Sequence, residues 1–264
     1  MLLLLLPFLL LASSSASSAA VVGSPLVIAW HTPSHAGAAA RLRSSCASAR
    51  LECAVTAVAA AEVARAGSYQ AFKVRFARSQ LLARRRAVVY VDADIEARSW
   101  PALLANATAG GGADYAFFDW RGGTLTMPPV VATGVFFLNY TVCGRRLAAA
   151  WEAAMAFGTN RRAADDQVVS LLLQAARGDG AIARRLGGCR CEWLPPEYLA
   201  ITGHPAFVQS YTLGRIVFEH TGMPSGAPVE SPLLPDDTSL AAALAELDGP
   251  AASAGRPDRS QELR

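Results

Sequence analysis

Short runs of uniformly apolar residues, separated by helix-like segments, constrain the fold of this chain more than any other feature. Pro25–Trp30 is one such run and Ala87–Val91 is another. Between them lie an Ala-rich stretch that continues to Arg50, an apolar segment at Cys53–Ala61 and an amphipathic helix pattern at Tyr69–Arg86. Strands that are apolar at every position are typical of a mainly parallel sheet covered on both faces. The sequence therefore predicts an α/β fold.

The same pattern continues through the second half of the chain. Tyr115–Trp120 and Val130–Leu138 are predicted strands, and Arg145–Phe157 and Asp166–Ala176 are predicted helices. With 264 residues and 52% hydrophobic content, the chain is long enough to bury one sizeable core. We expect a single domain over residues 24–221.

The two ends of the chain have a different composition. Residues 1–20 combine an apolar run with a Ser/Ala stretch, which is typical of a secretory signal peptide or, if it is retained, a short membrane anchor. Residues 222–264 are rich in Pro, Gly, Ala, Ser and Asp, and are expected to form a loosely ordered tail in which only Ser239–Leu247 could form a helix. The leader predicts a protein of the Golgi or ER lumen, or a secreted one.

Charge and cysteine content narrow the function further. A net charge of +3, with the arginines dispersed, does not favour nucleic-acid binding. Five cysteines in an oxidising compartment predict one or two disulfides and a leftover thiol, rather than a metal site. Lys73 is the single lysine in the sequence, and an ammonium can act as a compact point charge where the planar guanidinium of arginine cannot.

Two acidic residues, Asp92 and Asp94, directly follow the apolar run at Ala87–Val91. Ligands of open parallel sheets bind beyond the carboxyl ends of the strands, so chemistry is expected here. If the chain stays extended, both carboxylates point to one face, roughly 7 Å apart. Hard carboxylate oxygens favour Mn²⁺ or Mg²⁺, which bind through one or two carboxylates together with substrate phosphates. The pair therefore predicts a divalent-metal site that accepts a diphosphate.

The segment VVYVDADI at Val88–Ile95 resembles the strand and DxD motif of GT-A-type nucleotide-diphospho-sugar glycosyltransferases. The preceding helix, with Lys73 and Arg78, is similar to the basic helix that faces the donor in that family. The resemblance implies that Asp94 binds the metal directly and that Asp92 contacts it through water or contacts the donor ribose. Either Lys73 or Arg78 would then steady the diphosphate.

Further segments extend the resemblance over roughly residues 25 to 221. Thr133 and Gly134 are similar to the small-residue segment that lines the donor sugar pocket, and Trp151 follows on a helix, where we assign it to the core. Asp165 and Asp166 look like the acidic segment near the sugar and acceptor, where Asp166 would bind the donor sugar or act as general base.

The resemblance implies a GT-A-like, Rossmann-like domain with a mostly parallel central sheet flanked by helices. It also implies a metal-dependent transfer of a sugar, from a nucleotide-sugar donor of UDP type to a glycan, protein or lipid acceptor. His31, at the end of the first strand, is well placed to touch the base or ribose of the donor.

One departure from the family concerns a late histidine that many relatives supply as a further metal ligand. At the corresponding place, within Pro205–Tyr211, this chain has Gln209. His204 and His220 lie nearby, and the spacing does not choose between them; His204 is taken here as the predicted ligand. A non-catalytic relative that binds nucleotide sugar or glycan is the alternative that this departure favours.

A haloacid-dehalogenase-type phosphatase is the other alternative, because its site also begins with an apolar strand and Asp-x-Asp. That motif requires Thr or Val at the position where this chain has Glu96, and it requires a lysine further downstream. Lys73 lies upstream. The sequence therefore favours the transferase over the phosphatase.

Overall fold

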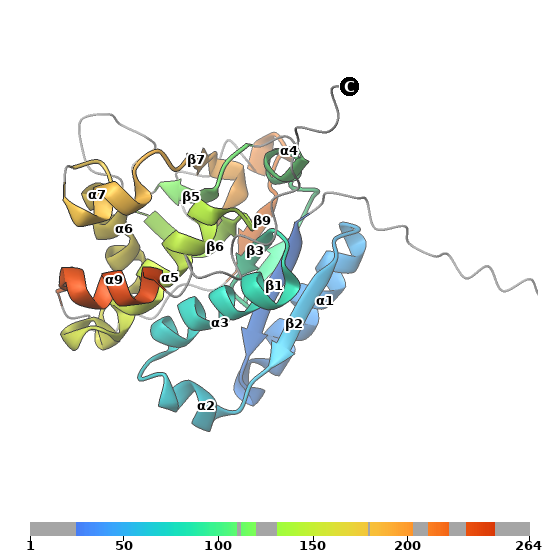
Figure 1. Cartoon of the computed structure of the whole chain (residues 1–264). Helices are drawn as coiled ribbons and strands as arrows, with labels where there is room; N and C mark the ends of the chain where they lie inside the picture. The colour runs from blue at the N-terminus through green and yellow to red at the C-terminus, as the bar shows by residue number, and fades with distance from the viewer. Residues whose placement is uncertain are drawn as a thin grey trace, which may run out of the picture.

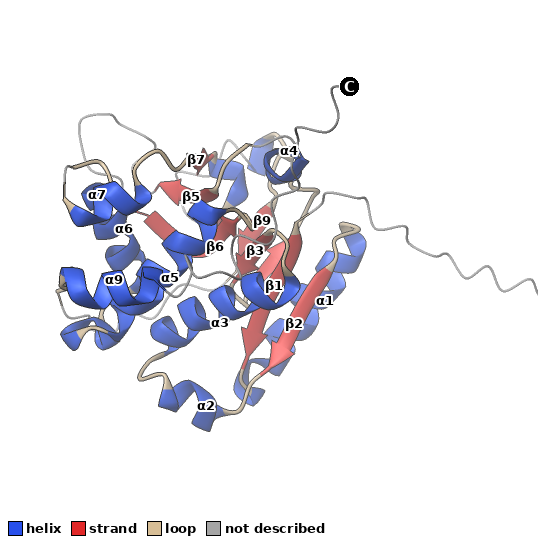
Figure 2. Ribbon diagram, in the orientation of Figure 1, coloured by secondary structure: helices blue, strands red, loops and turns tan. Residues whose placement is uncertain are grey.

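The computed structural model describes residues 25–109, 112–119, 131–178, 180–202, 211–221 and 231–245 (Figure 1). Its centre is a six-stranded sheet in the order β2-β1-β3-β6-β5-β7, with helices on both faces (Figure 2). The strands are β1 Leu26–His31, β2 Cys53–Ala57, β3 Val88–Val91, β5 Tyr115–Asp119, β6 Val131–Leu138 and β7 Cys191–Leu194. The predicted α/β fold with a mostly parallel central sheet is confirmed.

One strand of this sheet, β6, runs opposite to the other five. β1 is parallel to both β2 and β3, and β5 is parallel to β7. β6 lies between β3 and β5 and is antiparallel to both. Every residue of β1, β3 and β5 is buried, which is the physical reason that their sequences are apolar at successive positions.

The helices follow the predicted amphipathic segments closely. α3 begins after Ser68, whose hydroxyl accepts a hydrogen bond from the Ala71 amide at 3.0 Å, and ends where Arg85 takes a left-handed conformation with φ 50°. The longer helices are α1 Ala36–Ser48, α3 Tyr69–Arg84, α4 Ala102–Ala109, α5 Val142–Ala156, α6 Asp165–Ala175 and α9 Asp237–Ala245. The shorter ones are η1 Pro33–His35, α2 Ala60–Arg65, η2 Gly158–Arg162, α7 Ala181–Leu186 and η3 Pro196–Tyr198.

Two hydrophobic clusters, one on each face of the sheet, form the core. The larger contains the buried faces of α3, α5 and α6, and the smaller contains residues of α1 and α4. Trp151 of α5 is fully buried in the larger cluster, where its ring lies edge-on to Phe117 and Phe136. The assignment of Trp151 to the core is confirmed.

A second, three-stranded sheet lies beside the first, and the sequence pattern did not indicate it. It has the order β4-β9-β8, from β4 Ile95–Ala97, β9 Phe218–His220 and β8 Ala200–Ile201. β4 pairs with β9 in antiparallel fashion, so that Ile95 lies opposite His220. This pairing brings a late part of the chain to the residues that follow β3.

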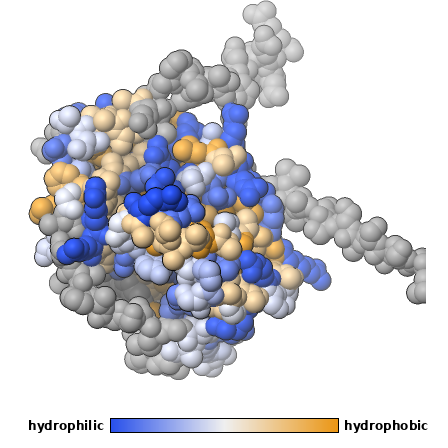
Figure 3. All heavy atoms as spheres, turned by 90° about the horizontal axis from the view of Figure 1, so that it is seen from below, coloured by the Kyte–Doolittle hydropathy of each residue, from blue (hydrophilic) through white to orange (hydrophobic). Residues whose placement is uncertain are grey.

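Two disulfides join neighbouring elements. Cys46 is bonded to Cys53, and Cys143 is bonded to Cys189, which leaves Cys191 as a free thiol. The expectation of one or two disulfides and a leftover thiol is therefore confirmed. Over the described part of the chain, no helix is both long enough and apolar enough to cross a membrane. Hydrophilic residues are spread over much of the face in Figure 3, with hydrophobic residues in small groups between them.

Part of the segment expected to be a loose tail packs against the domain. α9 matches the helix expected near Ser239–Leu247 and lies against α5 (Figure 1). Its side chains Leu240 and Leu244 are buried in the larger cluster. The buried Asn160 also fixes the chain before α9, because its side-chain amide donates to the Leu233 carbonyl and accepts from the Leu233 amide. Residues 231–245 thus contribute to the core.

Replacing Leu244 by Ala should lower the free energy of unfolding by roughly 2–5 kcal/mol, because the substitution leaves a cavity at a fully buried position. Urea denaturation measures the change. Leu234→Ala, at a residue that is 37% exposed, is the control and should cost less than about 0.5 kcal/mol. Equal effects of the two substitutions would contradict the packing of α9.

Candidate active site

The acidic pair after β3 lies in a tight turn. The Ile95 amide donates to the Asp92 carbonyl at 3.0 Å, which closes the turn over residues 92–95. The chain therefore does not stay extended through Asp94, which was the condition for both carboxylates to point to one face, because β3 ends at Val91 and the chain turns into β4. The carboxylates of Asp92 and Asp94 consequently have different neighbours.

Asp92 belongs to a buried network around the ammonium group of Lys73. The Lys73 Nζ lies 3.3 Å from both carboxylate oxygens of Asp92 and 3.2 Å from Oδ2 of Asp165. The Tyr90 hydroxyl donates to Oδ1 of Asp92 at 3.0 Å. The side chain of Lys73 is 12% exposed and that of Asp165 is 7% exposed, so these charges are compensated mainly by one another.

The network also shifts the pKa values of its members. Burial alone would lower the pKa of Lys73, but the charges of Asp165 and Asp92 outweigh burial and raise it above the usual range. Burial raises the pKa of the Asp92 carboxyl; Lys73 opposes that rise, and Asp165 and Asp94 add to it. Burial and the charge of Asp92 raise the pKa of Tyr90. At neutral pH the ammonium is thus charged, and the phenol keeps its proton as a donor.

Thr133 and Gly134, on β6, lie directly against this network. The ammonium of Lys73 lies 3.4 Å from the Thr133 carbonyl and 3.5 Å from its hydroxyl, and it can donate to either. The Gly134 carbonyl accepts from the Asp92 amide at 2.9 Å. A Cβ at Gly134 would meet Ile95 at 3.3 Å and Oδ2 of Asp92 at 3.5 Å, so a glycine allows the close approach of strand and carboxylate. Gly134 therefore lies beside Asp92, and Thr133 lies beside Lys73.

Asp94 points toward His220, which ends β9. Its Oδ2 lies 3.5 Å from Nε2 of His220, and its backbone carbonyl accepts from the Thr221 hydroxyl at 3.1 Å. The Asp94 side chain is 42% exposed, whereas that of His220 is 12% exposed, and Nδ1 of His220 is buried without a hydrogen bond. Of the two late histidines left open by the sequence, the structure brings His220 to the acidic pair; His204 lies outside the described residues.

The donor atoms of Asp94 and His220 suit a divalent cation. A carboxylate oxygen and an imidazole nitrogen 3.5 Å apart can both reach one Mn²⁺ or Mg²⁺ ion, with substrate oxygens at its other positions. Both carboxylate oxygens of Asp92 already accept hydrogen bonds, one from Lys73 and one from Tyr90, which suits a contact with the metal through water.

A cluster of three potential ligands, all within 4.8 Å of one another, occurs elsewhere in the described chain, at Asp114, Cys143 and Cys189. Its two sulfurs form a disulfide, so they are not available as thiolates. The carboxylate of Asp114 accepts from the Thr141 hydroxyl at 2.7 Å and from the Arg190 amide at 2.8 Å. This cluster therefore has a structural role.

The acidic segment that opens α6 reaches the same network. Asp165 pairs with Lys73, and its backbone carbonyl accepts from the Trp151 indole at 3.2 Å, which ties the segment to the core. Asp166 is partly exposed, and Oδ1 accepts from the Gln167 amide at 2.7 Å. Burial, followed by the charge of Asp165, raises the pKa of Asp166. A raised pKa makes this carboxylate a stronger proton acceptor when it is ionised.

Arg78 and His31 are directed elsewhere. Arg78 donates to Glu152 of α5 at 2.6 Å, and at about 100° per residue it lies roughly 140° around α3 from Lys73. His31 is 7% exposed; Nδ1 donates to the Thr32 carbonyl at 3.0 Å, and Nε2 accepts from Arg43 at 3.3 Å. The structure therefore does not bring either side chain to the network.

Tyr69 is a candidate that the sequence reasoning missed. The residue is 53% exposed, and its ring stacks on the buried Trp30 of β1 with ring centroids 5.7 Å apart. It precedes Lys73 by four residues on α3, so both lie on one face of the helix. The four-residue spacing between Tyr69 and Lys73 is visible in the sequence and could have identified Tyr69 as a candidate.

No protein-family model and no curated protein sequence matches this chain. Among solved structures, it is similar to a glycosyltransferase involved in the glycosylation of the major capsid of PBCV-1, at 13% identity and a TM-score of 0.49, over 85% of this chain and 98% of that one. It is also similar to the bifunctional glycosyltransferase WbbM, at 11% identity and a TM-score of 0.46, over 85% of this chain but half of that one. The function proposed below rests on the site itself.

Replacing Lys73 by Met should lower the free energy of unfolding by roughly 3 kcal/mol at pH 7.5, because Asp92 and Asp165 would remain buried without their counter-charge. Without the ammonium the two carboxylates repel each other while both are ionised, and this repulsion disappears as the pH falls and a carboxyl group takes up a proton. Urea denaturation at pH 5 should therefore show a smaller loss.

Arg84→Met is the matched control for this experiment, because Arg84 is an exposed cation on the same helix. It should change the unfolding free energy by less than about 1 kcal/mol at either pH. A loss for Lys73→Met that is the same at pH 7.5 and pH 5 would argue against a role for the ammonium charge.

Proposed function

We propose that this protein is a metal-dependent glycosyltransferase of the secretory pathway. It would move a sugar from a nucleotide-diphosphate donor, most simply a UDP-sugar, to a glycan, protein or lipid acceptor. The observation that carries the proposal is that two sets of interacting side chains, each with a carboxylate, lie next to each other in the turn that follows β3. One is the Lys73 network with Asp92 and Asp165, and the other is the pair Asp94 and His220.

The residues that would hold the metal are Asp94 and His220, with Asp92 as an outer contact. A divalent ion bound there supplies charge neutralisation for a departing nucleoside diphosphate. Lys73 holds the carboxylate of Asp92 in place and adds a positive charge beside the site. Tyr69, one helical turn away, offers an exposed ring on which a nucleobase can stack.

Asp166 is the proposed proton acceptor or sugar ligand. One of its oxygens accepts from the Gln167 amide, which leaves the other free to accept from a substrate hydroxyl. As general base it would take the proton of the acceptor hydroxyl while the bond from that oxygen to the sugar forms and the bond from the sugar to the diphosphate breaks. Asp165, fixed by Lys73 and Trp151, positions it.

Release of nucleoside diphosphate from a panel of nucleotide sugars, with and without Mn²⁺, tests the proposal. The intact protein should release diphosphate from one donor in a metal-dependent way, and Asp94→Asn should lower the rate about 100-fold or more. His220→Ala should raise the half-saturating Mn²⁺ concentration by roughly tenfold or more, because an imidazole ligand is lost.

Glu62→Gln, which removes an exposed carboxylate on α2, is the control and should behave as the intact protein does. Unchanged release from the Asp94 variant would refute the assigned site. Metal-dependent donor binding without release would instead identify a non-catalytic nucleotide-sugar-binding protein. Release of orthophosphate from phosphate monoesters would identify a phosphatase.

Asp166→Asn separates the two roles of that carboxylate. If Asp166 is the general base, the substitution should reduce kcat by about 100-fold or more and leave the donor Kd within about twofold. The pKa of Asp166 is raised, so this carboxylate takes up a proton at a higher pH than an ordinary carboxyl group does. As the pH is lowered, the rate of the intact protein should therefore begin to fall at a pH above the usual carboxyl range. Equal losses of turnover and donor affinity would identify a sugar ligand in place of a base.

A further inference from the structure

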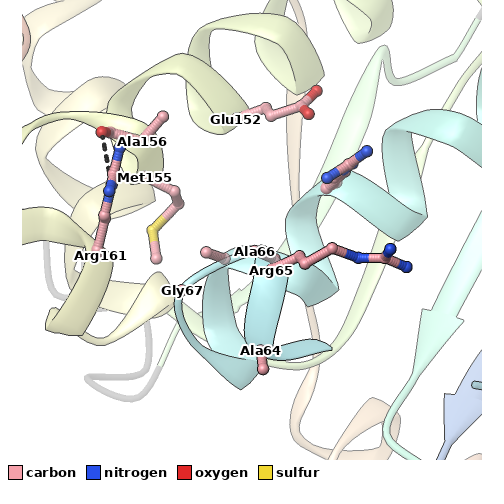
Figure 4. A pocket seen from close by; sticks show the side chains of 10 residues that line it. Ala64, Arg65, Ala66, Gly67, Glu152, Met155, Ala156 and Arg161 are labelled. Carbon is pink, nitrogen blue, oxygen red and sulfur yellow. Dashed lines mark hydrogen bonds between the residues drawn. The ribbon is translucent and has the colours of Figure 1, made fainter. Parts of the chain in front are cut away.

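A pocket of about 350 Å³ lies on the side of α3 that faces away from the Lys73 network (Figure 4). Its walls come from α2, the turn at Gly67, α3, the end of α5 and η2. Small or flexible apolar side chains leave the space open: Ala64, Ala66, Ala71, Met155 and Ala156. The volume is in the range of small-ligand sites.

Three arginines line this pocket, each from a different element. Arg65 ends α2, Arg75 is on α3 and Arg161 is in η2; all three are exposed. Within the described part of the chain, the side chains of Arg65 and Arg75 have no hydrogen bond or ion pair. Arg161 donates from Nε to the Ala156 carbonyl at 3.3 Å, and in Figure 4 its side chain lies beside Met155, whereas the Arg65 side chain extends away from it.

The acidic residue that lines the pocket, Glu152, does not balance the charges of these arginines. Glu152 lines the same space, but it accepts from Arg78 at 2.6 Å, so its charge is already paired. Glu62, the acidic residue of α2, does not line the pocket. Three arginines that line one pocket, with a single carboxylate that is already paired, therefore give it an excess of positive charge that a bound anion would relieve.

We propose that this pocket is a second ligand site, which binds an oxyanion group: a carboxylate, sulfate or phosphate. Guanidinium groups present planar sets of donors that match such groups in bidentate geometry. Lys73 and Arg75 are two residues apart on α3, about 200° around the helix, so the ligand does not share the donor site. The inference is independent of the proposed transferase activity.

The pocket is nevertheless close to the candidate active site along the chain. Arg161 precedes Asp165 by four residues, which limits the separation of their Cα atoms to about 14 Å. If the proposed function holds, an acidic sugar of the acceptor is a fitting source of the oxyanion. Inorganic phosphate is the other source of the same chemistry.

Isothermal titration of the full chain, without donor and with EDTA, tests the site. The probes are a uronic-acid-containing hyaluronan tetrasaccharide, the neutral chitotetraose and inorganic phosphate, at about 0.15 M salt. We expect the acidic tetrasaccharide or phosphate to bind, and the neutral tetrasaccharide not to bind. The double variant R65Q/R75Q should raise the Kd of the bound anion at least tenfold.

The matched control is R84Q/R215Q, which removes the same charge at two exposed arginines outside the pocket. It should leave the Kd within about twofold of that of the intact protein. Binding of the acidic tetrasaccharide supports an acidic glycan as the source, and binding of phosphate alone supports a free anion. Absence of binding by both anionic probes, or equal weakening by the two double variants, would overturn the proposal.

Discussion

The ammonium group of Lys73 joins the elements on which the candidate active site is built. From α3 it contacts Asp92 after β3, Asp165 at the start of α6 and the Thr133 backbone on β6. A compact charge with three donors can serve all of these partners at once, whereas a planar guanidinium presents its donors in a fixed fork. This geometry gives a physical reason for the single lysine in a chain otherwise rich in arginine.

Because of the turn after β3, the two carboxylates of the acidic pair have different neighbours and different exposure. Asp92 is held by the protein itself, through Lys73 and Tyr90, and Asp94 faces His220 with much of its side chain exposed. The small sheet makes this division possible, because the β4–β9 pairing fixes His220 beside the turn. One carboxylate is thus preorganised while the other is accessible to solvent and ligands.

Much of this arrangement could be predicted from the sequence, because strands buried on both faces must be apolar throughout. That rule located β1, β3 and β6, and helical spacing located α3. The direction of β6 leaves no mark on hydropathy, and β4 has only three residues, Ile95–Ala97. The role of His220 depends on a pairing between distant parts of the chain, which local patterns do not encode. Helical spacing does separate Arg78 from Lys73, and applying it would have excluded Arg78 from the network.

The position of β6 has a consequence for the order of folding during synthesis. β2, β1 and β3 are neighbours in a parallel unit made from the first third of the chain, whereas β6 and β5 follow later. Domains can begin to fold from the N-terminus while the ribosome is still adding residues. In that interval Lys73 has Asp92 but lacks Asp165, so the ammonium has only one of its two carboxylate partners until α6 emerges. The charge network is therefore complete only after β5 and β6 have been synthesised, and before β7.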